Sequence, residues 1–318
     1  MSSEESAAGN TWETAIDDDG DYKRKQSGFR DFVSSDGSSS FAAEAGRYHL
    51  YVSYACPWAH RTLIVRKLKG LEDCISFDVV HPLLGEKGWS LSSDYEGATG
   101  DTVNGFGYLR EAYFAAQPGY DGSITVPVLW DKKTRTIVNN ESAEIIRMLN
   151  SEFQEFSGNP ELDLYPAELR DPIDDVNEWV YDTINNGVYR CGFAKKQAAY
   201  SRAFKKLFAS LNRVEGILAE NRYLTGDTFT EADVRLFTTL VRFDAVYVTH
   251  FKTNQRRITD YPNLWNYTRE IYQMSGVADT VNMDHIKYHY FASHLHINPF
   301  GIVPDGPAID FTEPHTRG

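Results

Sequence analysis

The residue best suited to chemistry in this sequence is Cys56, in the stretch HLYVSYACPWAHRT at residues 49–62. An apolar run typical of a strand precedes it, and Pro57 follows it where a helix is expected to begin. A cysteine at a helix N-terminus faces backbone N–H groups and the positive end of the helix dipole, which lower the thiol pKa from ~8.5 toward ~3.5 to 7.5. We therefore predict a reactive thiolate rather than a buried structural cysteine, with Arg61 in the next turn deepening the effect.

The fourth position of this motif is Ala59, where a dithiol motif would have a second cysteine. A mixed disulfide at Cys56 would therefore need an external thiol for its release. Cys74 and Cys191 are interpreted as small buried hydrophobic residues. Three scattered cysteines indicate neither a disulfide framework nor a C-x-x-C pair.

Two further stretches could bind a small peptide-like ligand. In TVPVLW, Pro127 predicts a strand end with bare backbone, to which a cis bond would contribute and at which an extended peptide could pair. In NNESAEII, Asn139 or Asn140 is expected to cap a helix whose first N–H groups, with the Ser142 hydroxyl, can hold a carboxylate. Glu141 is placed to take an ammonium group. Taken alone, this second stretch is explained more simply as an ordinary helix start.

The elements that must position these residues alternate between strand and helix up to about residue 160. Residues 47–55 and 74–82 are predicted strands, joined by a helix over 57–70 that Gly70 closes. After a Gly-rich loop, the pattern predicts a helix at 108–116, strands at 124–131 and 134–139, and a helix at 140–150. The order is βαβ followed by αββα.

Beyond about residue 160 the pattern is helical. Apolar residues recur at helical spacing in residues 171–189 and again in 202–220. In FTEADVRLFTTLV, Thr230 and Asp233 form a predicted capping box. We divide the chain into a partly flexible N-terminal extension, an α/β domain and an all-α domain with a wrapping tail, at residues 1–45, 46–158 and 159–318.

Composition limits the partners of this chain. It has 318 residues, 42% of them hydrophobic, and a net charge of −13, which repels phosphate backbones and anionic lipid headgroups. The acidic N-terminus lacks the basic start and apolar core of a signal peptide, and no apolar run reaches ~18 residues. We expect a globular, cytoplasmic protein that binds neither nucleic acid nor membranes.

The histidines of the C-terminal part raise the question of a metal. His285 and His289 have the i, i+4 spacing of a helical pair, but no carboxylate or cysteine accompanies them as in a zinc motif. We predict no metal, and a structural or rim role for these histidines.

Read together, these parts describe a thioredoxin-like domain followed by a helical domain. The strings CPWAHRT, TVPVLWD, NESAEIIRMLN, YDTINNGVY, TGDTFTEADVRL and HYF.SH..INP.GIVP.GP closely resemble the glutathionyl-hydroquinone reductases, the xi class of glutathione transferase-like proteins. The similarity runs from about GFRDFV to the C-terminus. It implies a glutathione transferase-like fold, glutathione as co-substrate and a homodimer. The chain departs from the family pattern at the tail residues Tyr288, Leu295 and His296, at Cys191 and in the Gly-rich loop after Trp89.

The resemblance also implies roles for individual residues. The nucleophile would be Cys56, and glutathione would be held by Trp89, Arg110, Val126, Glu141 and Ser142. Three tyrosines would line the quinol pocket, with Tyr189 and Tyr290 taken as catalytic and Tyr247 as binding. By itself each tyrosine is more simply a core residue, because the chain has 19 of them.

The family's reaction removes glutathione from a glutathionylated hydroquinone. Cys56 would attack the glutathionyl sulfur, and a second glutathione would resolve the mixed disulfide. Two alternatives use the same fold. One is a general thiol transferase or dehydroascorbate reductase without a quinol pocket, and the other is a non-catalytic binding module.

Overall fold

The computed structural model describes residues 16–317, and within them the chain forms two compact units that are interleaved in the sequence. The first consists of Lys25–Leu162 and Thr280–Leu295, and the second of residues 16–24, Asp163–Asp279 and residues 296–317. The domain boundaries drawn from the sequence stay a prediction. No helix in the described residues is long and apolar enough to cross a lipid bilayer.

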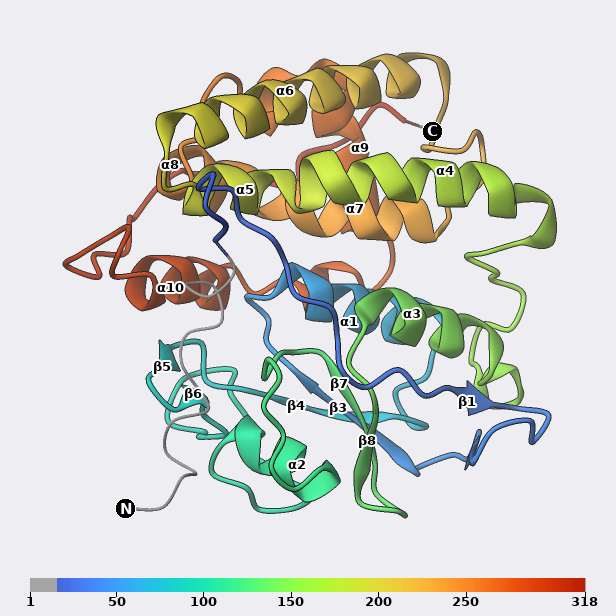
Figure 1. The fold of residues 1–318 in the computed structure, drawn as a ribbon. Coiled ribbons are helices and arrows are strands. Elements are labelled where there is room, and N and C mark those ends of the chain that lie inside the picture. The colour runs from blue at the N-terminus through green and yellow to red at the C-terminus, as the bar shows by residue number, and fades with distance from the viewer. Residues whose placement is uncertain (1–15, 318) are drawn as a thin grey trace. The chain divides into compact units, whose positions relative to one another are not determined.

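The first unit is built on a mixed four-stranded sheet in the order β4-β3-β7-β8 (Figure 1). Strand β3 is parallel to β4 and antiparallel to β7, which is antiparallel to β8. The sheet strands are β3 (Tyr48–Val52), β4 (Ser76–Val79), β7 (Val128–Asp131) and β8 (Thr136–Asn139). Every residue of β3 and of β7 is buried, which explains their continuous apolar runs.

Helices cover both faces of this sheet. Figure 1 shows α1 (Pro57–Leu68) and α3 (Ser142–Ser151) on one face and α2 (Leu109–Ala116) on the other. Helix α1 ends just before Gly70, whose φ of +62° favours glycine and whose Cβ position lies 2.9 Å from the backbone of Gly158. The predicted thioredoxin-like arrangement is therefore confirmed.

Two pairs of short strands, one 3-10 turn and one helix also belong to the first unit. They are β1 (Val33–Ser34) paired with β2 (Phe41–Ala42), β5 (Leu84–Gly85) paired with β6 (Gly88–Trp89), a 3-10 turn at Gln154–Phe156, and α10 (Met283–Ser293). The last of these comes from the C-terminal part of the chain.

The regular elements of the second unit are helices, and its described segments 16–24 and 296–317 contain none. Its α-helices are α4 (Arg170–Val180), α5 (Gly187–Phe193), α6 (Gln197–Glu220), α7 (Glu231–Arg242), α8 (Val248–His250) and α9 (Pro262–Gln273). Its shorter turns are 3-10 turns at Ala167–Leu169 and Ile258–Asp260 and π-helical turns at Tyr181–Asn185 and Phe243–Tyr247. The predicted all-α second part is confirmed.

Candidate active site

Cys56 lies where strand β3 has ended and helix α1 begins, as the sequence predicted. It is the N-cap residue of α1, Pro57 is the first helical residue, and the first turn has neither an acidic residue nor a hydrogen bond from the side chain of the N-cap. Cys56 is half-buried, whereas Cys74 and Cys191 are buried. Burial raises the pKa of the Cys74 thiol, and raises the pKa of Cys191 to about 12. Of the three thiols, Cys56 is thus the one placed to react.

The backbone before strand β7 approaches this cysteine. The Cys56 thiol donates to the carbonyl oxygen of Val126 at 3.6 Å, and the Val126–Pro127 peptide bond is cis, as the sequence suggested. The buried Tyr113 hydroxyl fixes this segment by donating to the Thr125 carbonyl at 2.7 Å and accepting from the Thr125 N–H at 3.2 Å. Val126 is therefore held beside the reactive sulfur.

Arg61 connects the start of α1 with the start of α3. Its side chain is buried, its guanidinium lies 4.5 Å from the Trp58 ring centroid, and its Nη1 donates to the Ser142 hydroxyl at 3.3 Å. A buried positive charge thus stands between Cys56's helix and Ser142, where it favours anionic groups.

The start of α3 is built differently from the prediction. Glu141, and neither Asn139 nor Asn140, is the N-cap residue, and its carboxylate accepts from the Ala143 N–H at 3.1 Å. The Asn139 side chain instead accepts from the Glu141 N–H at 2.7 Å. The capping prediction was wrong because a carboxylate one residue later also fits the first turn.

Asn140 and Glu141 are engaged by the segment that precedes the sheet. Asn140 Oδ1 accepts from the Phe29 N–H at 3.0 Å, and the Ser27 hydroxyl donates to Glu141 Oε2 at 3.0 Å. Long-range pairing of residues 27–31 with the end of β8 therefore decides which side chain is left to cap α3. Nothing local in the sequence signals this pairing.

Trp89 and Arg110 lie on neighbouring segments of the first unit. Trp89 ends β6 and is 8% exposed, and its neighbour Ser90 forms a bridge with Tyr108, which precedes α2. Arg110 stands in the first turn of α2, with its guanidinium 5.4 Å from the Tyr108 ring centroid. It forms no ion pair with any carboxylate that the structure describes, so its charge is available to a ligand carboxylate.

Tyr290 belongs to the first unit although it is near the C-terminus. It lies on α10 and is 1% exposed. Its ring centroid is 5.2 Å from that of His289, and the His289 ring is stacked on Trp89 at 5.0 Å. The structure therefore groups Tyr290 with Trp89, a proximity that their separation in the sequence does not indicate.

Tyr189 and Tyr247 lie together in the second unit. Their ring centroids are 6.1 Å apart, and Tyr247 is stacked on Phe251 at 5.4 Å with 8° between the planes. Phe251 packs against α5 at Gly192, which has no Cβ. A Cβ at this position would lie 2.1 Å from the Phe251 ring, so a larger residue would clash. Trp89 and Tyr290 belong to the first unit, and Tyr189 and Tyr247 belong to the second.

A π-helical turn accompanies each of these two tyrosines. One, at Tyr181–Asn185, precedes the helix that carries Tyr189, and the other, at Phe243–Tyr247, ends at Tyr247 itself. Such turns are rare and concentrate at functional sites. The sequence analysis missed both, because a π turn adds one residue to a helix without changing its composition.

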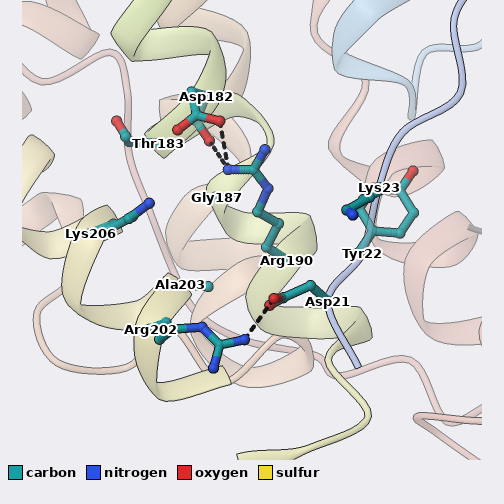
Figure 2. Close-up of a pocket in the computed structure, with 10 residues that line it drawn as sticks. All are labelled: Asp21, Tyr22, Lys23, Asp182, Thr183, Gly187, Arg190, Arg202, Ala203 and Lys206. Carbon is teal, nitrogen blue, oxygen red and sulfur yellow. Dashed lines mark hydrogen bonds and ion pairs between the residues drawn. The ribbon is translucent and has the colours of Figure 1, made fainter. Parts of the chain in front are cut away.

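A pocket of about 190 Å³ lies wholly within the second unit (Figure 2). None of the predicted site residues lines it. Its two guanidinium groups are paired, Arg190 with Asp182 at 2.7 Å and Arg202 with Asp21 at 2.6 Å. Lys23 is paired with Asp17 at 3.0 Å, and Lys206 adds a further positive charge. We assign the pocket no part in the predicted site.

The fold and the single cysteine at the start of α1 define a glutathione transferase. Two family models match, "Glutathione S-transferase, N-terminal domain" at residues 55–152 and "Glutathione S-transferase, C-terminal domain" at residues 197–270.

Two relatives that are similar over nearly their whole length carry the name of one group of these transferases. The chain is 55% identical to the glutathionyl-hydroquinone reductase YqjG of Escherichia coli, covering 96% of this chain and 95% of that protein. It is 50% identical to the glutathionyl-hydroquinone reductase PcpF of Sphingobium chlorophenolicum, covering 93% of each.

Solved structures of xi-class proteins have the same fold as this chain. The glutathione-bound structure of YqjG matches with a TM-score of 0.89 at 56% identity, covering 91% of this chain and 96% of that one. The xi glutathione transferase of Phanerochaete chrysosporium matches with a TM-score of 0.91 at 53% identity, covering 94% and 96%. The chain belongs to the xi class of glutathione transferases, the family of the glutathionyl-hydroquinone reductases.

Proposed function

We propose that this chain is a glutathionyl-hydroquinone reductase that uses glutathione as co-substrate. The observation that carries the proposal is 55% identity to a reductase of that name over nearly the whole of both chains. The site agrees with it chemically, because a half-buried cysteine begins α1 and Ala59 stands where a resolving thiol would be.

The proposed reaction has two thiol steps. The glutathionylated hydroquinone first tautomerises to a keto form, since an aryl thioether is a poor target for a thiolate. The Cys56 thiolate then attacks the glutathionyl sulfur, and the carbon–sulfur bond breaks with its electron pair passing to the ring, which takes up a proton and becomes hydroquinone. A second glutathione attacks the mixed disulfide and releases oxidised glutathione and the Cys56 thiolate. Overall, the thioether sulfur of the substrate and the thiol sulfur of the second glutathione are each oxidised by one electron, the ring is reduced by two electrons, and Cys56 is regenerated.

The tyrosines are assigned to the ring. Tyr290 and Tyr189 donate hydrogen bonds to its developing oxyanion and transfer the proton, and Tyr247 binds it. The phenol hydroxyl suits this task because it can both donate and accept a hydrogen bond.

Glutathione is assigned to the first unit. Val126 presents its backbone beside the sulfur, Glu141 and Ser142 receive the charged γ-glutamyl end, and Trp89 and Arg110 hold the remainder. The proximity of Cys56 and Val126 and the bond from Arg61 to Ser142 support this assignment, because they join three of the predicted positions.

We also propose a cytoplasmic homodimer. A reducing compartment suits an enzyme that is regenerated by glutathione. The exposed Phe300 and Ile302 offer apolar surface for association. Light scattering at several concentrations and cell fractionation test these two points.

Mass spectrometry of the protein after reaction with a glutathionylated hydroquinone tests the main proposal. We expect hydroquinone to be released and a single glutathione adduct on Cys56, which disappears when glutathione is added. A chain that takes glutathione from a glutathionylated peptide but not from the quinol substrate would be a general thiol transferase. A chain that forms neither adduct would be a non-catalytic binding module.

A further inference from the structure

Helix α10 is fastened to the segment that carries Trp89. The Ser293 hydroxyl accepts from the Leu84 N–H at 3.0 Å, and the Tyr95 hydroxyl donates to Asp284 at 2.7 Å. Between these ends, His285 and His289 each contact a backbone carbonyl of the same segment. Residues about 200 positions apart in the sequence thus form one substructure of the first unit.

The two histidines use opposite ring nitrogens. His285 Nε2 lies 2.6 Å from the Glu96 carbonyl oxygen, and His289 Nδ1 lies 2.9 Å from that of Pro82. A carbonyl oxygen only accepts, so the hydrogen is on Nε2 in His285 and on Nδ1 in His289. Both side chains are buried, so both bonds are shielded from water.

Only His289 also contacts residues assigned to the reaction. Its ring is stacked on the Trp89 indole with 24° between the planes and stands edge-on to its neighbour Tyr290 at 75°. His285 instead lies edge-on to Tyr54 and Tyr95, neither of which has a proposed role. The pair therefore shares a helix and a type of hydrogen bond but differs in what its rings touch.

We propose that His289 is a positioning residue that holds the glutathione-binding Trp89 and the proton-donating Tyr290 in one fixed arrangement. This inference rests on the proposed function for the roles of those two residues. The His289 imidazole fixes the indole by stacking, and the helix backbone fixes Tyr290 relative to both. The bond to Pro82 satisfies the buried ring nitrogen of His289.

The need for such a residue follows from the shortness of the element that carries Trp89. Trp89 ends a two-residue strand at the edge of a long loop. An indole that can rotate away costs binding affinity, because the ligand must then order it. Misplacement of a reacting group by about 1 Å can cost on the order of 100-fold in rate.

Three substitutions separate stacking from hydrogen bonding. His289→Phe keeps a flat ring on Trp89 but removes the donor, and His289→Asn keeps a donor near the position of Nδ1 but removes the ring. His285→Asn is the control for the loss of a buried imidazole one turn earlier on α10, and it removes both the ring and the bond from Nε2 to the Glu96 carbonyl. Steady-state kinetics with a glutathionylated hydroquinone and with a simple glutathione mixed disulfide, and calorimetry of glutathione binding in a Cys56→Ser background, are the readouts.

We expect His289→Asn to raise KM for glutathione and its dissociation constant about 10-fold, and to lower kcat on the quinol more than on the mixed disulfide. His289→Phe should keep KM within about threefold, and His285→Asn should lower Tm without this KM and kcat pattern. Equal kinetic effects of His289→Asn and His285→Asn would overturn the proposal, as would a tenfold rise in KM for His289→Phe, which remains decisive if His289→Asn does not fold. An unsubstituted chain that forms no Cys56 adduct would instead refute the proposed function.

Discussion

Two helix starts in this molecule both follow an extended N-cap residue but have opposite electrostatics. Helix α1 begins after Cys56 with Pro57, and α7 begins after Thr230 with Glu231. The third residue is Ala59 in α1 and Asp233 in α7. In α7 the Asp233 carboxylate accepts from the Thr230 N–H at 2.9 Å, completing the predicted capping box.

The acid in α7 is also tied to its surroundings. Asp233 is fully buried and accepts from the Leu224 N–H at 3.0 Å and the Tyr267 hydroxyl at 2.8 Å. Its carboxylate occupies the positive end of its helix for structural purposes. Helix α1 has no acid in its first turn, so the same positive end can act on Cys56. We call the start of α7, where Asp233 lies, the closed start, and the start of α1, where no acid lies, the open start. The closed start stabilises the fold, and the open start serves chemistry.

The largest expected effect comes from removing the sulfur at the open start. Cys56→Ser should lower reductase turnover more than ~1,000-fold, because a serine hydroxyl is a far weaker nucleophile and cannot form the mixed disulfide. Turnover and mass spectrometry measure it. Cys191→Ala, which removes a buried thiol, should retain activity, and full activity of Cys56→Ser would end the proposed mechanism.

Removing the acid at the closed start should affect folding instead. Asp233→Ala removes the acceptor of four donors and should lower the free energy of unfolding by about 3 kcal/mol in urea denaturation. The rate of adduct formation at Cys56 in the folded protein should be unchanged. A slower adduct reaction with unchanged stability would reverse the contrast between the two helices.

Tyr290→Phe tests the proton transfer to the quinol separately from the attack by the Cys56 thiolate. It should lower kcat on a glutathionylated hydroquinone by ~100-fold, because general acid catalysis is lost, while a simple mixed disulfide should be little affected. Parallel kinetics on the two substrates measure it. Equal losses on both would argue against proton donation.

The closed start also predicts a pH dependence of stability. Burial raises the pKa of the Asp233 carboxyl to about 6, above the ~3.9 of an unfolded aspartate. The folded chain therefore binds this proton more tightly, so the contribution of Asp233 to stability is greatest below about pH 4 and is lost as pH rises to 6. Relative to Asp233→Asn, the chain should gain about 2 kcal/mol of unfolding free energy between pH 7 and 4. No change in this difference would contradict the shift.

The smallest effect concerns the ionisation of the three thiols. Alkylation of Cys56 should reach half its limiting rate at least about one pH unit below the ~8.5 of a free cysteine. Cys74 and Cys191 should react only after unfolding, because burial raises the pKa of both thiols. Peptide mapping after iodoacetamide labelling at a series of pH values distinguishes the sites. Labelling of Cys56 that follows a free cysteine would remove the distinction between open and closed starts.

Features that depend on neighbouring residues could be predicted from the sequence. Local periodicity and backbone preference predict a strand that ends before Cys56 and a helix that begins at Pro57 and is closed by Gly70. They also predict the capping box formed by Thr230 and Asp233. The cap of α3 could not, because the choice among Asn139, Asn140 and Glu141 depends on the distant pairing of Ser27 and Phe29. The grouping of Trp89 with Tyr290 is equally long-range.

The sequence by itself determined the βαβ and αββα order of the first unit, the place of Cys56 at a helix start and the absence of a second thiol in that motif, because each rests on residues close together in the chain. The tertiary structure alone decided that α10 joins the first unit, that His289 stands between Trp89 and Tyr290, and that Arg61 reaches Ser142. These contacts join segments far apart in the chain, and the free energy that selects them comes from burial and hydrogen bonding in the assembled unit, which no short stretch encodes.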